Sequence, residues 1–165
     1  MRVRILTNSL ESNDVIAAHA GYARRRPGLV ASGVELYEMR SDAGTIKRRV
    51  VSSKSRAGLH AKAMVFDRES IFVGSFNLDP RSGSLNTEGG LFVESPGLAE
   101  QLAAFMDEGV STENSYRVLL DENGDLVWVT EIDGIGVGTG NEPGASLGNS
   151  FMTGLIQILP IEGQL

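Results

Sequence analysis

Three residues with complementary chemistry, His60, Lys62 and Asp67, follow one another with the spacing H-x-K-x(4)-D. A Gly-Ser-x-Asn segment, residues 74–77, comes a few positions later. A neutral imidazole can attack phosphorus and carry a phosphoryl group. An ammonium group, a hydroxyl and an amide N–H can surround the charged oxygens of the phosphate. The pattern therefore predicts a site that holds and attacks a phosphate ester.

Five side chains would share this chemistry. His60 is the expected nucleophile, and Lys62, Ser75 and Asn77 are the expected phosphate ligands. Glu88 stands at the start of the next apolar run. A carboxylate there would hold the imidazole in one tautomer and support its charged form. Such a site can stabilise charge on phosphorus without a metal ion, and we expect neither a metal nor another cofactor.

Two other interpretations of the motif are weaker. His60 and Lys62 could be ordinary polar residues at a sheet edge, but the accompanying Ser, Asn and Glu complete a phosphate-binding set. A metal site built from His60, Asp67 and Glu88 is disfavoured because Lys62 would bring a second cation beside the metal. A turn between two strands explains Asp67 better than a direct chemical role does.

Strand alternation predicts how the polar groups meet. It places His60 and Lys62 on one face of a first strand, and Ser75 and Asn77 on one face of the next. If Asp67–Ser70 forms a four-residue turn, antiparallel pairing sets Lys62 opposite Ser75. The polar groups would then gather at one end of a hairpin.

Seven positions together resemble the HKD motif of the phospholipase D superfamily and the elements that follow it. These positions are His60, Lys62, Asp67, Gly74, Ser75, Asn77 and Glu88. The resemblance implies that the motif His is a covalent nucleophile, that the Lys and Asn bind phosphate, and that the Glu hydrogen-bonds the His. It also implies that the motif Asp and the following Gly support the site without reacting.

Longer stretches are similar to the C-terminal half of bacterial cardiolipin synthases. They are Thr7–Glu38, Asn77–Ser82 and Ile158–Leu165. The resemblance narrows the substrate to a phospholipid and implies a phosphatidyltransferase that works through a phosphohistidine intermediate. It also implies a bacterial protein in the cytoplasm or at the inner face of the membrane, with the membrane surface as a peripheral partner.

The family pattern contains two HKD motifs, whereas this sequence contains one. We therefore expect residues 1–165 to be a single phospholipase D-like domain, the second half of a longer two-motif protein. Alternatively, two copies pair about a two-fold axis as a homodimeric phosphodiesterase or nuclease. A non-catalytic phosphate- or lipid-binding half is a third interpretation. In the first two, the expected partner is a second motif-bearing domain, and the isolated chain would be weakly active or inactive.

Two further residues are candidates for substrate contact. His19 lies beside Val15 and Tyr22 on helical spacing, so a satisfied, half-buried histidine is the alternative. Arg81 could bind a phosphate or lipid head group, or it could be an exposed loop arginine.

The net charge of −6 hides an asymmetry. Residues 1–68 carry 13 Lys or Arg and six Asp or Glu, a net charge of +7, while residues 69–165 carry two and 15, a net charge of −13. The basic half would attract an anionic lipid or membrane surface, although its Lys/Arg clusters could also be solvated faces. The acidic half disfavours a nucleic-acid partner. Because the sequence contains no Cys, disulfides and thiolate zinc sites are excluded.

The element pattern predicts an α/β fold with a mixed sheet of about six or seven strands, flanked by helices on both faces. Strands are expected at Arg2–Thr7, Val34–Met39, the motif hairpin, Gly89–Glu94, Arg117–Asp121 and Leu126–Thr130. Helices are expected from Ser12 or Asn13 to Gly33, from Ser95 to Gly109 and around Asn149–Leu159.

Three further expectations concern single segments of this pattern. Pro27 should kink the first helix or start a second one. The hairpin around Asn123-Gly124 should be a peripheral addition to the sheet. The glycine-rich segment Gly134–Gly148 should be a mobile flap over the site.

Overall fold

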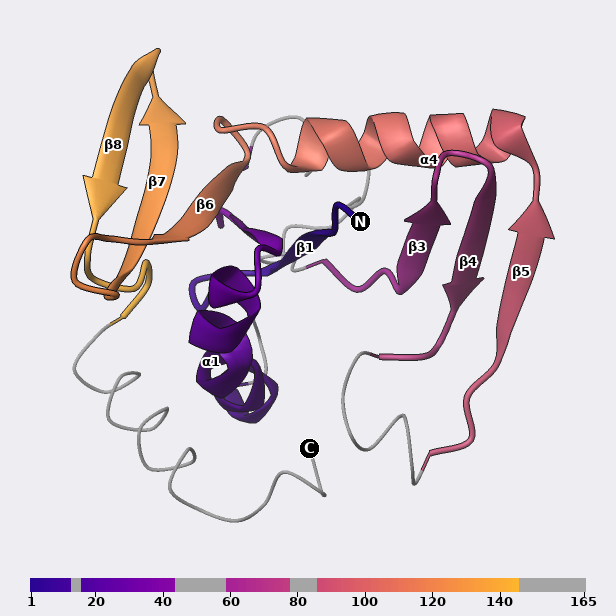
Figure 1. Cartoon of the computed structure of the whole chain (residues 1–165), viewed down its shortest axis with the longest axis horizontal. Coiled ribbons are helices and arrows are strands. Elements are labelled where there is room, and N and C mark those ends of the chain that lie inside the picture. The colour runs from indigo at the N-terminus through magenta and orange to yellow at the C-terminus, as the bar shows by residue number, and fades with distance from the viewer. Residues whose placement is uncertain (13–15, 44–58, 78–85, 146–165) are drawn as a thin grey trace. The chain divides into compact units, whose positions relative to one another are not determined.

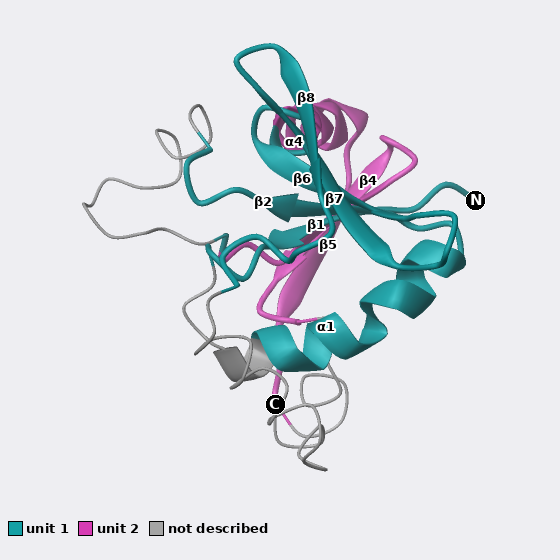
Figure 2. Cartoon of the chain, turned by 90° about the vertical axis from the view of Figure 1, so that its left-hand side faces the viewer, with its two compact units in different colours: residues 1–59, 109–159 teal, residues 60–108, 160–165 magenta. Residues whose placement is uncertain are grey.

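The computed structural model describes residues 1–12, 16–43, 59–77 and 86–145 (Figure 1). The chain divides into two compact units, which Figure 2 distinguishes by colour. Unit 1 comprises residues 1–59 and 109–159, and unit 2 comprises residues 60–108 and 160–165. Each unit has its own sheet, so the predicted α/β class is confirmed. The described strands form a five-stranded and a three-stranded sheet, instead of one sheet of six or seven strands.

The sheet of unit 1 has the strand order β1-β2-β6-β7-β8. Its strands are β1 (Arg4–Asn8), β2 (Glu35–Met39), β6 (Ser115–Leu120), β7 (Leu126–Ile132) and β8 (Ile135–Thr139). β1 and β2 are parallel, and the other neighbours are antiparallel, which makes this a mixed sheet as predicted.

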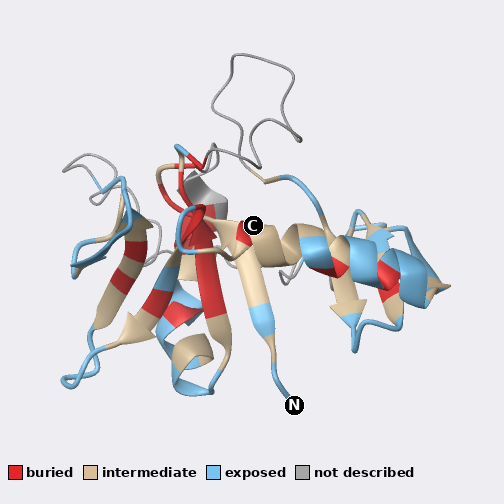
Figure 3. Ribbon diagram, turned by 90° about the horizontal axis from the view of Figure 1, so that it is seen from above, coloured by how far each residue is buried: buried red, intermediate tan, exposed pale blue. Residues whose placement is uncertain are grey.

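The core of unit 1 lies on β2, β6 and β7. Leu36, Val118 and Trp128 are buried and pack together, and Figure 3 colours the buried residues red. The prediction that the hairpin around Asn123-Gly124 is peripheral is therefore wrong. Its strands β6 and β7 pair with each other, and β6 pairs with β2 at the centre of the sheet. Burial of the Trp128 ring makes this hairpin part of the core.

One helix, α1 (Ile16–Ala31), packs in unit 1 against β2 and β6. Pro27 lies inside this helix, so the alternative of a second helix starting at Pro27 is wrong. Gly33 follows the helix with a φ of 87°, a left-handed conformation that glycine adopts at helix C-termini without steric cost. The predicted role of Gly33 is confirmed.

Unit 2 contains a three-stranded antiparallel sheet of β3 (Ala63–Phe66), β4 (Ser70–Gly74) and β5 (Gly90–Glu94). Helix α4 (Pro96–Gly109) follows β5 and carries the buried Ala99 and Ala103. Arg68, in the turn between β3 and β4, forms ion pairs with Glu100 at 2.8 Å and Asp107 at 2.6 Å. These pairs hold α4 to the hairpin.

The register of the motif hairpin differs from the predicted one by one residue. Phe66 pairs with Ser70, so three residues connect the strands instead of four. As a result, the carbonyl of Lys62 accepts a hydrogen bond from the N–H of Gly74 at 3.0 Å, and Lys62 is not opposite Ser75. A one-residue shift moves side chains to the other face of a strand. The expected cross-strand pairing is therefore wrong.

The glycine-rich segment is only partly a loop. Residues 135–139 form β8, the edge strand that pairs with β7, so the prediction of a mobile flap is wrong for this part. Asp133 and Gly134 have positive φ values of 52° and 77° and make a tight turn between the two strands. The helix expected around Asn149–Leu159 lies outside the described residues.

Candidate functional site

The turn before β4 explains the position of Asp67. Asp67 and Arg68 have φ values of 50° and 58°, and the N–H of Glu69 donates to the carbonyl of Phe66 at 2.9 Å. Two consecutive positive φ values are the requirement of a type I′ turn, and Asp tolerates this conformation better than most residues. Asp67 is exposed, which agrees with its interpretation as a turn residue.

His60 and Lys62 are brought together at the start of the motif strand. Lys62 Nζ lies 2.9 Å from His60 Nε2, and the His60 side chain is exposed. An ammonium group can only donate, so this contact requires Nε2 to accept and the imidazole to be neutral with its proton on Nδ1. The electron pair of Nε2 therefore points at the Lys62 ammonium group.

Ser75 and Glu88 are brought together where β4 ends and β5 begins, at the same end of the sheet as the start of β3. The Ser75 hydroxyl donates to Glu88 Oε2 at 2.5 Å and accepts from the N–H of Gly89 at 3.1 Å. The N–H of Ser75 also donates to the carbonyl of Gly89 at 2.9 Å. Asn86 Nδ2 donates to the other carboxylate oxygen, Oε1, at 3.4 Å. The carboxylate of Glu88 is thus fixed from both sides.

Gly74 permits this arrangement through a close approach of two backbones. A Cβ at residue 74 would lie 2.4 Å from the carbonyl oxygen of Gly89 and 2.8 Å from Cα of Gly90. Real Cβ contacts are longer, so a larger residue would push the two strands apart. The sequence predicted a supporting role for Gly74, and the structure supplies a physical basis for it.

An aromatic pocket lies on one face of the three-stranded sheet. It has a volume of about 420 Å³ and is lined by Met64, Phe66, Phe72, Phe76, Glu88, Gly89, Gly90 and Phe92. The rings of Phe66 and Phe92 have centroids 5.8 Å apart. Glu88 is the one charged residue of this lining, so its carboxylate borders an apolar environment.

Three other residues were candidates for contact with the substrate, and the structure describes two of them, Asn77 and His19. Asn77 is exposed beyond the end of β4. Arg81 lies outside the described residues. His19 is in unit 1, on α1.

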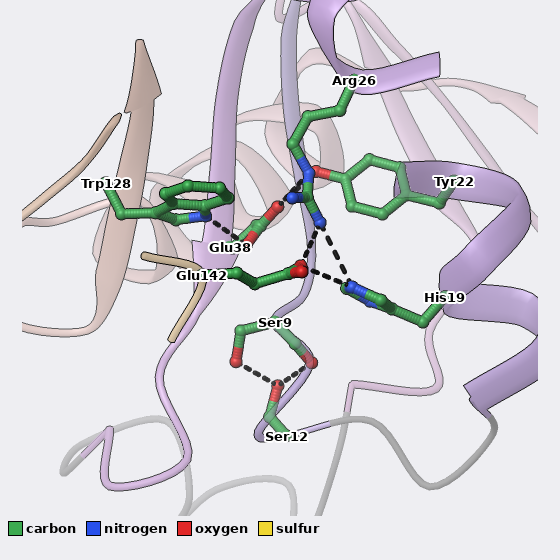
Figure 4. Close-up of polar contacts among 8 residues, drawn as sticks. All are labelled: Ser9, Ser12, His19, Tyr22, Arg26, Glu38, Trp128 and Glu142. Atoms are coloured by element: carbon green, nitrogen blue, oxygen red, sulfur yellow. Dashed lines mark hydrogen bonds and ion pairs between the residues drawn. The ribbon is translucent and has the colours of Figure 1, made fainter. Parts of the chain in front are cut away.

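His19 is buried, with 1% of its surface exposed. Figure 4 shows its contacts with Arg26 and Glu142. His19 Nε2 lies 2.6 Å from Glu142 Oε1 and 3.2 Å from Arg26 Nη2. The shorter distance assigns the Nε2 proton to the bond with Glu142. This environment favours the structural interpretation of His19 over a substrate contact.

His19 belongs to a buried polar network around Arg26. The Arg26 guanidinium lies 2.9 Å from Glu38 Oε1 and 2.6 Å from Glu142 Oε1, and it stacks over the rings of Tyr22 and Trp128. Glu38 also accepts hydrogen bonds at 2.8 Å from Tyr22 Oη and from Trp128 Nε1. Burial, assisted by the charge of Glu38, raises the pKa of Tyr22.

The pKa of Glu142 is shifted in the opposite direction. Burial alone would raise it, but the hydrogen bond from His19 and the charge of Arg26 outweigh burial and lower the pKa below 4.5. Glu142 follows β8, 123 residues after His19, and so ties a late segment of the chain to α1. Sequence periodicity offers no signal for a contact at this separation.

Asn8 is a residue whose role the sequence did not suggest. Its Nδ2 donates to the carbonyl of Leu59 at 2.9 Å, and the N–H of Leu59 donates to its Oδ1 at 2.6 Å. The side-chain amide therefore pairs with the Leu59 backbone as a neighbouring strand would. Leu59 is the residue immediately before His60.

Among the described residues, no group of three His, Asp or Glu side chains lies close enough together to bind a metal ion. Neither of the helices α1 and α4, which the structure describes, has the length and apolarity that a bilayer crossing requires.

The family model for the cardiolipin synthase PLD-like domain matches residues 1–109. The chain is 39% identical to Cardiolipin synthase C of Escherichia coli (strain K12) over 165 residues, which is 98% of this chain and 35% of that protein. Uncharacterized proteins of two Helicobacter pylori strains, J99 and 26695, are 32% and 30% identical over 97% of this chain and 31% of theirs. The chain thus spans about a third of the length of these relatives. No solved structure matches it.

Proposed function

The chain belongs to the family of cardiolipin synthase PLD-like domains, and from this premise we propose that it supplies one half of the active site of a phosphatidyltransferase. The observation that carries the proposal is the 2.9 Å contact between Lys62 Nζ and His60 Nε2. It places the electron pair of Nε2 beside the cation that a phosphate oxygen would seek, and a bound phosphate that took over the Lys62 hydrogen bond would release that pair for attack.

The reaction would proceed in two displacements. In the first, His60 Nε2 forms a bond to phosphorus while the bond from phosphorus to the leaving alcohol breaks, and the alcohol oxygen takes a proton from an acid. In the second, the hydroxyl of another lipid head group attacks, the phosphorus–nitrogen bond breaks, and the hydroxyl proton returns to that acid. Exclusion of water favours transfer over hydrolysis.

The neighbouring residues would stabilise this path. Lys62 and Asn77 would donate to the non-bridging oxygens as charge develops on them. Glu88 would accept a hydrogen bond from the Nδ1–H of His60 and would stabilise the ring when it becomes charged. Asp67 would shape the turn, and Gly74 would allow the close approach of the two strands.

The acid for the leaving alcohol would come from a second motif. In a longer polypeptide it would stand in another domain, and the partial coverage of the relatives supports this arrangement. In a homodimeric phosphodiesterase, it would be the His60 of a second copy. Either way, the isolated chain would be weakly active or inactive. The substrate would be a phospholipid reached at a membrane surface.

The test uses the native polypeptide that carries this sequence and vesicles of phosphatidylglycerol labelled at the phosphodiester. We expect His60→Asn to abolish product. Denaturing the parent protein at alkaline pH, where a phosphorus–nitrogen bond survives, should trap label on His60. Because His60 is exposed, the variant should unfold at the same denaturant concentration as the parent. Turnover that persists in the folded variant would refute the proposal. Activity of the isolated chain as a dimer would favour the phosphodiesterase instead.

A further inference from the structure

We propose that Ser75 is a positioning residue that acts through Glu88, and not a ligand of the substrate phosphate. The inference rests on the function proposed above, because it concerns how the same site is held. It changes the role that the sequence pattern suggested for the serine of the Gly-Ser-x-Asn segment.

The hydroxyl of Ser75 has one proton, and the structure assigns it a partner. The distance to Glu88 Oε2 is 2.5 Å, at the short end of the range for a hydroxyl that donates to a carboxylate. The carbonyl of Gly89, at 3.3 Å, is a weaker acceptor for the same proton. The oxygen lone pairs are used as well, since the N–H of Gly89 donates to them at 3.1 Å.

A phosphate oxygen would compete for that single proton. Phosphate oxygens accept hydrogen bonds, so Ser75 could bind them only by giving up its bond to Glu88. A hydrogen bond to a charged acceptor is roughly twice as strong as one between neutral groups, and the exchange would leave the carboxylate without this donor. Lys62 and Asn77 can donate without such a loss, because they hold several N–H groups each.

The backbone around Ser75 also keeps the hydroxyl in place. The N–H of Ser75 donates to the carbonyl of Gly89 at 2.9 Å, and Gly74 allows these backbones to approach closely. Ser75 therefore joins the end of β4 to the residues that precede β5. As a result, the carboxylate of Glu88 has a fixed orientation. The Ser75 hydroxyl holds Oε2, and this also determines the direction of Oε1.

The test is a double-mutant cycle on kcat in the native polypeptide, with Ser75→Ala, Glu88→Ala and the double variant. We expect Ser75→Ala to lower kcat roughly 10- to 100-fold, as loss of orientation does, with little change in KM. The double variant should be no slower than Glu88→Ala alone, because residues that act as a unit are not additive. Ser75→Thr, which keeps the hydroxyl, should recover most of the rate.

Two measurements separate positioning from phosphate binding. The affinity for inorganic phosphate, measured by calorimetry, should stay within about twofold in Ser75→Ala, since phosphate loses no contact there. Ser70→Ala, which removes a hydroxyl from the same strand β4, serves as the matched control and should keep its full rate. Weaker phosphate binding in Ser75→Ala, together with losses that add in the double variant, would overturn the positioning role.

His60→Asn in the same assay distinguishes this failure from failure of the proposed function. Turnover that survives His60→Asn would refute the proposed function itself. Turnover that depends on His60, combined with additive losses at Ser75 and Glu88, would refute the positioning role alone.

Discussion

Asn8 pairs with the backbone of Leu59 through both groups of its side-chain amide, at 2.9 Å and 2.6 Å. The amide has the donor and the acceptor of a peptide group, so it can complete the pairing of one residue as a neighbouring strand does. In this way the last residue of β1 holds the residue that precedes the motif histidine.

Replacement of Asn8 by Ala should destabilise the protein by about 1–3 kcal/mol, because it leaves the N–H and C=O of Leu59 without these partners. Urea unfolding measures the loss. Asn141→Ala is the matched control: Asn141 is exposed, and its backbone, not its side chain, bonds to Thr139, so its removal should change stability by less than about 0.5 kcal/mol. Equal effects of the two substitutions would show that the Asn8 pairing contributes nothing.

Replacement of Gly74 by Ala should separate β4 from β5 next to Ser75 and Glu88. The added Cβ meets backbone atoms at 2.4 Å and 2.8 Å, and backbone cannot rotate out of the way as a side chain can. We expect a loss of about 1–3 kcal/mol in stability, as for other overpacked sites. Gly97, an exposed residue of α4 with open space around its Cα, is the comparison. Gly97→Ala should raise stability slightly, and a tolerated Gly74→Ala would contradict the close approach.

Removal of Glu38 from its buried pair should be costly. Glu38→Ala removes the carboxylate that lies 2.9 Å from the buried Arg26 guanidinium and that accepts from Tyr22 Oη and Trp128 Nε1, and breaking such a buried pair typically costs about 3–5 kcal/mol. The exposed pair of Arg2 and Glu35 is the control, since Arg2→Ala should cost at most about 1 kcal/mol. Chemical denaturation of both variants measures the difference. Similar losses at the two pairs would show that burial does not strengthen the interaction.

Stability should depend on pH through Glu142. Its pKa is lowered in the folded protein: burial opposes the shift, but His19 and Arg26 outweigh it. A carboxyl with a lowered pKa contributes stability above its unfolded pKa, and this contribution disappears as the pH falls through the folded pKa. The unfolding free energy of the parent should therefore exceed that of Glu142→Gln near pH 7, and the gap should narrow below pH 4.5. A gap that is constant with pH would contradict the assignment.

Local chemistry made several elements predictable. The Asn123-Gly124 turn, the left-handed Gly33 and the start of α4 at Pro96 follow from the conformational preferences of single residues. The motif pattern likewise pointed to His60 and Lys62, whose side chains lie in contact.

Other features depend on the count of residues in a turn or on contacts between distant segments. The hairpin register was wrong because three residues connect β3 and β4, and nothing in Asp-Arg-Glu-Ser distinguishes a three-residue from a four-residue turn. The β6–β7 hairpin was misjudged because alternation identifies a strand but not its neighbours in the sheet. β8 was missed because glycines at alternate positions, 136 and 138, weaken the strand signal.

The buried network illustrates the same limit within the candidate residues. In the sequence, His19 is recognisable only as a histidine on one face of a helix. Its partner Glu142 lies far along the chain, after β8. Only the fold brings these two residues together.

The contact between His19 and Glu142 limits how far the chain can be shortened at its C-terminal end. A fragment trimmed to residues 1–109, the region that the family model matches, would lack β6, β7 and β8 and would expose the apolar side of β2. It would also lose Trp128 and Glu142, so the guanidinium of Arg26 would keep Glu38 alone as its carboxylate partner. Expression trials and domain exchanges that keep the region through residue 145 would preserve this core, and shorter versions would be prone to aggregation.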